Sequence, residues 1–365
     1  MDGTDQIVCP RCQGELWNRD DQWSCRGCGS SYRGLRGIPD LRTDDDLFLS
    51  NQADWEFALR LNEDYPRLDF RGLLERYYDL SPEIPPDLRR RQIGHILAGP
   101  ERFTEQLEES VRLRFLISGG RVLDLGCGTG SVLLALARRP AGLDGFDGER
   151  PLYGLDIALR WLLLARKRLD EEGYRHVRLV CGCAERQPFR SESFGGLIGG
   201  DVIEHVTDQA ATLGEAHRLL EPWGRLFLAT PNRFSLAPEP HVQVWGVGFL
   251  PRRWMPAYVR WKRQVDFRAI RTLHSGEWRR MLRASPFGRG EITAPGLSSR
   301  ELAEFPPMKR LLGRVYNRVF TGFGRGLALA FGPFFHLHCQ RVDVTQERPP
   351  TPAIRRHSRP STARA

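Results

Sequence analysis

The sequence has few lysines and no long apolar run. Arginine supplies nearly all of the 54 basic residues and the formal net charge of +9, because the only lysines are Lys167, Lys262 and Lys309. This bias is more typical of genome composition than of selection for nucleic acid, although arginine also binds phosphate or carboxylate. The longest apolar run, 326–335, is about half the roughly 20 residues that cross a bilayer. The first residues, MDGTDQIVCP, contain no apolar segment, so we predict no secretory signal and expect a cytoplasmic protein.

Four of the eight cysteines are regularly spaced near the N-terminus. Cys9 and Cys12 form one C-x-x-C pair, and Cys25 and Cys28 form a second pair after twelve further residues. Two such pairs complete a tetrahedral Zn²⁺ site of four thiolates, which stabilises a segment too short to fold on its own core. Two disulfides are the alternative, but a reducing cytoplasm disfavours them. We therefore predict a structural zinc ribbon at 1–42.

The rest of the chain divides by its hydrophobic pattern. At 43–118 apolar residues recur three and four apart, which predicts a helical connector, interrupted by Pro82, Pro85 and Pro86. From 119 to 345 strands and helices alternate, as in a parallel sheet. Strands are predicted at 121–125, 152–156, 177–181, 196–200, 225–229, 290–294 and 334–344, and helices at 131–139, 158–172 and 208–220. The tail at 346–365 is rich in proline, arginine and serine and is predicted to be disordered and basic.

These segments predict an α/β fold. The expected architecture is a Rossmann-like, seven-stranded, mostly parallel sheet with helices on both faces, preceded by the zinc ribbon and the connector. Insertions at about 233–274 and 296–333 are too long for plain connections and are expected to form lids.

The stretch RVLDLGCGTG, residues 121–130, indicates the ligand of this sheet. Gly126, Gly128 and Gly130 allow a backbone to pass close to a ligand. Asp124 would repel the pyrophosphate of a dinucleotide, whereas S-adenosylmethionine presents an ammonium and a sulfonium instead. Asp156 ends the next strand, where a carboxylate accepts hydrogen bonds from both ribose hydroxyls. The pattern therefore favours S-adenosylmethionine.

The order of VLDLGCGTG, LYGLDIA, CGCAERQPF, DVIEHV and LLEPWGRLFLATPN over residues 119–232 resembles class I S-adenosylmethionine-dependent methyltransferases. Within them it is most similar to the ubiquinone-biosynthesis O-methyltransferase group. The resemblance implies cofactor contacts from Asp124, Gly126, Cys127, Gly128, Thr129, Gly130, Asp156, Ile157, Cys183, Ala184, Glu185 and Asp201. Residues 7–41 resemble zinc-ribbon proteins that partner RNA-modifying and translation-factor methyltransferases, which implies that the ribbon can bind a protein partner.

The sequence departs from the family pattern at three positions. Cys183 stands where the family has the aspartate that accepts from the adenine amino group, and a thiol accepts only weakly. Gly195 replaces an aspartate, and Trp223 replaces a glycine of a turn. Backbone groups around residues 183–185 are expected to compensate at the adenine.

Catalytic candidates lie after the fourth and fifth strands. His205 has an ordinary pKa suited to removing a hydroxyl proton, against the alternative of a packed histidine. Asp201 and Glu204 flank it, and in some relatives such acids help hold a divalent cation. Asn232, Glu239 and His241 are candidate acceptor contacts, with His241 a second candidate catalytic residue, against turn and capping roles. Cys127, Cys181 and Cys339 are treated as small core residues.

Two later stretches combine aromatic or apolar residues with arginine. Trp245, Trp254, Trp261 and Trp278 with their neighbouring arginines predict a solvated face over packed tryptophans, with RNA or phospholipid binding as alternatives. The segment 308–332 is predicted to be a lid helix, with peripheral membrane contact as the alternative.

The sequence as a whole predicts an S-adenosylmethionine-dependent methyltransferase that acts on a small-molecule acceptor. A hydroxyl oxygen of a quinone, a lipid-linked compound or a secondary metabolite is the expected target. The rivals are an RNA methyltransferase and a non-catalytic scaffold that binds the cofactor. No N-P-P-Y motif follows the fourth strand, which disfavours methylation of a base amino group.

Overall fold

The computed structural model describes residues 6–110, 113, 120–139, 151–298, 302–303, 306–320 and 324–342. The predicted disordered tail at 346–365 lies outside the described residues.

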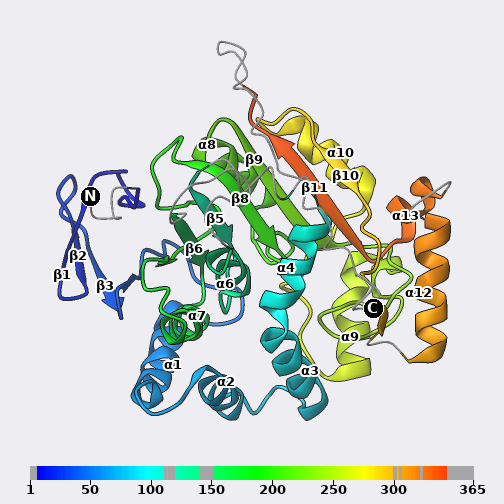
Figure 1. The fold of residues 1–365 in the computed structure, drawn as a ribbon, viewed down its shortest axis with the longest axis horizontal. Coiled ribbons are helices and arrows are strands. Elements are labelled where there is room, and N and C mark those ends of the chain that lie inside the picture. Colours follow the sequence, from blue (N-terminus) through cyan, green and yellow to red (C-terminus); the bar gives the residue numbers. More distant parts are fainter. Residues whose placement is uncertain are drawn as a thin grey trace, which may run out of the picture.

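A seven-stranded sheet forms the centre of the molecule (Figure 1). Its strand order is β10-β11-β9-β8-β5-β6-β7, in which β5 to β9 run parallel and β11 is antiparallel to both of its neighbours. The bounds are β5 Val122–Leu125, β6 Leu152–Asp156, β7 Arg178–Cys181, β8 Phe194–Gly200, β9 Leu220–Pro231, β10 Glu291–Thr293 and β11 Phe334–Gln340. The predicted fold class is confirmed, although β9 begins earlier and β11 ends earlier than the sequence pattern suggested.

Helices cover both faces of this sheet because its strands bury side chains on both sides. One face packs on α4 Gly99–Glu109, α6 Ser131–Ala137 and α7 Leu159–Glu171, and the other on α8 Gln209–Leu219 and α10 Ser275–Ala284. Successive side chains of β5 point to opposite faces of the sheet. Val122 packs in the hydrophobic core under α4, α6 and α7, whereas Leu123 and Leu125 pack in the core under α8 and α10.

The segment between the cysteines and the sheet is helical. It comprises α1 Asn51–Asp64, α2 Phe70–Asp79, α3 Pro86–Leu97 and α4. The Ser50 hydroxyl and the Asp69 carboxylate accept backbone N–H groups at the starts of α1 and α2, and Pro86 opens α3 where a missing N–H costs nothing. Helices α1 and α2 pack against α7, and α4 packs against α6.

A buried ion-pair network fixes the linker between the two sheets. The Asp54 carboxylate accepts from Arg42 at 2.7 Å, from Arg160 at 2.5 Å and from the Leu159 amide at 2.8 Å. Arg42 also pairs with Asp40 at 2.7 Å. Since Leu159 opens α7, the Asp54 charge also complements the positive end of that helix.

The N-terminal segment forms a small antiparallel sheet, with β1 Leu16–Arg19, β2 Gln22–Cys25, β3 Ser31–Leu35 and β4 Ile38–Pro39. It packs against the edge strand β7 of the large sheet. The Leu41 amide donates to the Cys181 carbonyl at 2.8 Å, and the Val8 amide donates to the Pro188 carbonyl at 2.9 Å. Trp23 belongs to the same hydrophobic core as the large sheet. The four-cysteine segment is therefore part of this protein's own core.

The insertion after β9 contains two short 3-10 helices, η2 Val247–Phe249 and η3 Arg252–Trp254, and the helix α9 Met255–Arg263. The later insertion contains α12 Pro307–Phe320 and α13 Arg325–Phe331, at the opposite end of the molecule from β1–β3 (Figure 1). The prediction of packed tryptophans was wrong for three of the four, because only Trp278 is buried while Trp245, Trp254 and Trp261 are exposed.

Candidate active site

A large cavity opens at the carboxyl ends of β5, β6 and β8. Its volume is about 940 Å³. Ligand pockets for single small molecules span roughly 300–1,000 Å³, so this cavity has room for a cofactor together with an acceptor. Gly130 is the one predicted cofactor residue that does not line the cavity. The other eleven line it, namely Asp124, Gly126, Cys127, Gly128, Thr129, Asp156, Ile157, Cys183, Ala184, Glu185 and Asp201.

The glycine turn after β5 depends on backbone freedom and on close packing. Gly126, Gly128 and Gly130 have φ angles of +68°, +49° and +74°. A Cβ on Gly126 would lie 2.4 Å from the Val202 side chain, whereas a Cβ on Gly128 would meet nothing within 4 Å. Gly126 is therefore required by packing, and Gly128 leaves open space next to the cavity.

Two carboxylates lie beside this turn. Asp156 accepts the Gly128 amide on one oxygen and the Ala158 amide on the other, each at 2.8 Å, so both oxygens keep a lone pair for a ligand. Asp124 is buried, and its Oδ2 atom has no hydrogen-bond partner among the described residues. These groups suit a ligand that offers hydroxyls at one end and a cation at the other.

The pKa values of the two carboxyls favour a cationic ligand. Burial raises the pKa of Asp156 to about 6. Burial and the neighbouring Asp156 charge raise the pKa of Asp124 well above its usual range. A cation beside Asp124 offsets this cost, whereas a phosphate would increase it. The residues present therefore fit S-adenosylmethionine, whose methionine end is positively charged.

The segment expected at the adenine is covered by the linker that follows the small sheet. The Cys183 thiol lies 3.7 Å from the Asp44 carbonyl oxygen, and Asp44 itself lines the cavity. The Glu185 carboxylate accepts the Thr207 amide at 2.7 Å, so it also fixes the start of α8. The linker supplies groups on this side that the sequence pattern did not reveal.

The predicted catalytic histidines meet, although 36 residues separate them. His205 Nε2 and His241 Nε2 are 3.0 Å apart, and His241 Nδ1 lies 2.6 Å from a Glu239 carboxylate oxygen. Glu239 also accepts the backbone amides of His241 and Val242, which fixes the turn. Because Nδ1 of His241 faces a carboxylate, it carries a proton, and Nε2 of neutral His241 then accepts a hydrogen bond from the Nε2–H of His205.

The two histidines of this hydrogen-bonded chain differ in pKa. Burial, followed by the nearby His241 charge, lowers the pKa of His205 to about 3. Burial also acts to lower the pKa of His241, but the hydrogen bond and charge of Glu239 outweigh it and raise that pKa. The Nδ1 atom of His205 is shielded from solvent and has no hydrogen-bond partner among the described residues. A proton taken up by this pair of rings is therefore held by His241.

Glu204 provides a further buried acid at this place. Burial and the Asp201 charge raise its pKa to about 8, and Thr230 donates to one oxygen at 3.0 Å. One atom each from Glu204, His205 and His241 lies within 4.8 Å of the others, so these three residues could also hold a divalent cation.

Other candidates lie outside the cavity wall. Asn232 is a turn residue, because its amide donates to the carbonyls of Ala330 and Gly332 and its oxygen accepts the Phe234 amide. Neither expected lid, at 233–274 or 296–333, contributes a described residue to the wall. The wall instead includes 44–48 and residues of α3 and α4, among them Phe103 and Gln106. Only the apolar spacing of α4 hinted at its burial.

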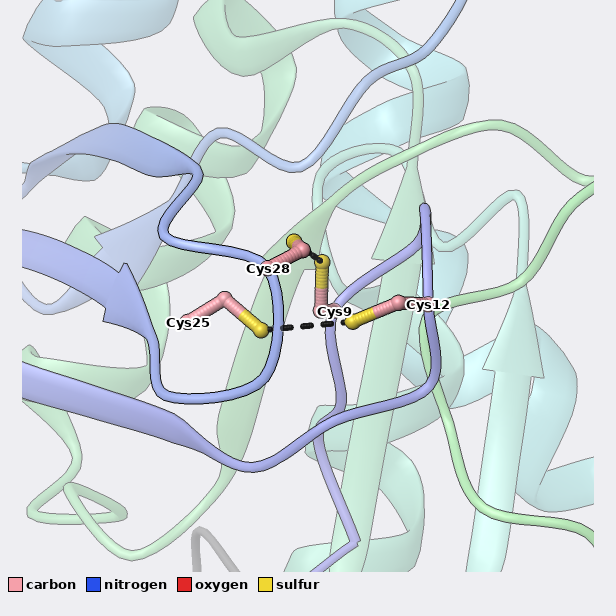
Figure 2. A group of neighbouring side chains, drawn as sticks. All are labelled: Cys9, Cys12, Cys25 and Cys28. Carbon is pink, nitrogen blue, oxygen red and sulfur yellow. Dashed lines mark hydrogen bonds between the residues drawn. The ribbon is translucent and has the colours of Figure 1, made fainter.

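The four spaced cysteines come together as a separate site. Figure 2 shows their sulfur atoms gathered from two loops, with Cys9 and Cys28 3.7 Å apart and Cys12 and Cys25 3.4 Å apart. Zn–S bonds of about 2.3 Å place tetrahedral sulfurs roughly 3.8 Å apart, so the spacing fits zinc. A Cβ on Gly14 would approach two of these sulfurs to 3.1 Å.

In comparisons with known proteins, a family model described as a methyltransferase domain matches residues 116–258. A ubiquinone/menaquinone biosynthesis C-methyltransferase of Coxiella burnetii is 32% identical over 38% of this chain and 53% of its own. A ubiquinone biosynthesis O-methyltransferase of Pseudomonas aeruginosa is 35% identical over 45% of this chain and 61% of its own. The chain thus spans little more than half the length of these relatives. A solved structure of a putative methyltransferase from Bacillus halodurans has a TM-score of 0.41 at 18% identity, covering 66% of this chain and 99% of that one.

Proposed function

We propose that this protein transfers a methyl group from S-adenosylmethionine to a hydroxyl oxygen of a small molecule, which the match of residues 116–258 to a methyltransferase domain supports. The observation that carries the proposal is the pair Asp124 and Asp156 beside the glycine turn, in a cavity large enough for two ligands. Two of the relatives above are named as methyltransferases of ubiquinone or menaquinone biosynthesis, which supports a small aromatic or lipid-linked acceptor.

Each end of the cofactor has a matching group. Asp124 accepts from the ammonium, Asp156 accepts from the ribose hydroxyls, and backbone groups around Cys183 and Ala184 contact the adenine. When bound, S-adenosylmethionine supplies a methyl group on a good leaving group, so the protein has mainly to align the acceptor and exclude water.

His205 is the general base. The acceptor hydroxyl gives its proton to the hydrogen-bonded pair of His205 and His241 as its oxygen takes the methyl group, and the proton is held by His241, which has the higher pKa of the two. The positive charge then lies beside Glu239, which is 2.6 Å from His241. Glu239 thereby orients His241 and stabilises its charged form, as the third member of a catalytic triad does.

The decisive experiment is to incubate the protein with methyl-labelled S-adenosylmethionine and fractionated cell material, and to locate the label by mass spectrometry. We expect an O-methyl ether in the small-molecule or lipid fraction. A C-methyl product would refute the hydroxyl acceptor and the base role of His205. Label in RNA alone would make the protein an RNA methyltransferase, and tight cofactor binding without labelling of any fraction would make it a scaffold.

We also propose that Cys9, Cys12, Cys25 and Cys28 bind one structural Zn²⁺. The support is the approach of the four sulfurs within 4.8 Å and the glycines that leave them room. Metal analysis of the purified protein should give one zinc per chain, and Cys25→Ser should lose it. Ser24→Ala, a change at an exposed neighbour, is the matched control. Retention of zinc by Cys25→Ser would refute the four-thiolate site.

A further inference from the structure

The helix α12 turns an apolar stripe outward. Met308, Leu311, Leu312 and Val315 recur at the spacing of one helix face, and they are 70%, 56%, 61% and 49% exposed. An amphipathic helix of a water-soluble protein normally turns such a stripe toward the core. The neighbouring helix α13 also exposes Leu327 and Phe331.

The inward side of α12 is held by polar groups, so the orientation of the helix is fixed. Arg310 donates to the carbonyls of Leu302 and Ala303 at 3.0 and 2.8 Å. The Asn317 side chain makes two hydrogen bonds with the Leu297 backbone, each at 2.8 Å. Rotation of α12 to bury its leucines would break all of these bonds.

The charged side chains of α12 all have one sign. Lys309, Arg314 and Arg318 are exposed on α12. The sequence contains no aspartate or glutamate between Glu304 and Asp343, a stretch that includes both α12 and α13. A second copy of this helix would bring cations against cations, which is unfavourable. An apolar stripe flanked by cations instead complements a surface of acyl chains under anionic headgroups.

The position of α12 agrees with an outward-facing role. Neither α12 nor α13 contributes a described residue to the wall of the large cavity. The described helices, α12 and α13 included, are too short or too polar to cross a bilayer, so any membrane contact of α12 would be at the surface. The C-terminal end of α13 is tied to the residue that follows β9, because Asn232 donates to the Ala330 and Gly332 carbonyls. A surface contact at α12 is therefore linked to the strand end that leads into the loop of His241.

We propose that α12 lies on the surface of an anionic membrane, with Met308, Leu311, Leu312 and Val315 inserted below the headgroups and Lys309, Arg314 and Arg318 against them. This proposal does not depend on the chemistry of the cavity. It would place a methyltransferase domain next to lipid-dissolved acceptors.

The test is flotation of the full-length protein with vesicles of phosphatidylcholine alone or of an equimolar mixture with phosphatidylglycerol. Wild-type protein should float with the mixed vesicles, and less so at high salt. The double change Leu311→Ser and Leu312→Ser should weaken binding by at least about ten-fold. Arg314→Gln and Arg318→Gln should each weaken it by about five-fold. Leu59→Ser, at an exposed leucine of α1, is the matched control and should bind as wild type.

Circular dichroism and thermal melting of each variant separate loss of binding from loss of folding. Failure of the wild type to float would overturn the proposal, as would a folded double variant that floats normally. Equal binding to neutral vesicles would refute the role of the three cations. Self-association that disappears in the double variant, without vesicle binding, would show that the stripe is a protein interface instead.

Discussion

The two sides of the large cavity are built in different ways. The cofactor side is made by short turns that directly follow β5 and β6, and its glycines and acids lie within a few residues of those strands. On the side proposed for the acceptor, His205, just after β8, lines the cavity and contacts His241 of the long insertion after β9, which itself lies outside the described wall. Local turn chemistry therefore specifies the first side, whereas tertiary packing of an insertion specifies the second. This difference suggests that binding and chemistry can be altered separately.

The strongest test of this separation is His205→Ala. Loss of a general base lowers kcat by roughly 10²–10⁴-fold. The dissociation constant for S-adenosylmethionine should stay within about two-fold of wild type, because His205 belongs to the other side of the cavity. Turnover assays and calorimetric titration measure the two quantities, and His217→Ala, on α8, is the matched control. A large loss of cofactor affinity would show that the two sides are coupled.

Gly126→Ala tests how strictly the turn of the cofactor side is specified. The left-handed φ angle and the 2.4 Å approach of the new Cβ to Val202 together predict a loss of about 2–5 kcal/mol in the free energy of unfolding. Gly128→Ala has a similar φ angle but open space, so it should lose only about 1–2 kcal/mol. Urea unfolding of both variants checks this, and equal losses would mean that packing against Val202 is unimportant.

Asp156→Asn should weaken cofactor binding by roughly 10–100-fold, because two charge-assisted hydrogen bonds to the ribose become weaker. Turnover at saturating cofactor should change much less. Asp69→Asn, at the start of α2, keeps a good capping residue and is the control. If Asp156→Asn bound S-adenosylmethionine as tightly as the wild type, the proposed contact between Asp156 and the ribose would be refuted.

The smallest expected effect is on pH dependence. The raised pKa of Asp156, about 6, means that its carboxyl is ionised above that pH and takes up a proton below it. Cofactor affinity in the wild type should therefore fall by about ten-fold from pH 7 to pH 5. The Asn variant should lose this part of the pH dependence. Titrations across that range measure it, and a flat wild-type profile would contradict it.

The residues that the sequence predicted around the glycine turn line the cavity, and they could be found because their signals are local. Asp124 and Gly126 lie at the end of a buried strand, and the required backbone angles can be inferred from the glycines themselves. The cysteine pairs are equally local, since their spacing alone brings four thiols together. The seven strands followed from apolar runs separated by turns.

The remaining features depend on contacts that no local pattern encodes. Residues 44–48 and residues of α3 and α4 line the cavity, although the sequence pattern predicted only a helical connector there and 44–48 are not helical. The meeting of His205 with His241 was not foreseen, since each was proposed from its own motif. The helical period of α12 was visible, but which of its faces points outward is decided by Arg310 and Asn317.

The small N-terminal sheet has a consequence for solubility. Strand β7 ends the large sheet, and an uncovered edge strand is a template for pairing with another chain. Here the backbone around Leu41 bonds to Cys181 at that edge, and the four-cysteine segment packs over it. Removal of about the first forty residues would therefore expose the unpaired backbone groups of β7. The shortened protein should then aggregate, even where its catalytic groups are intact.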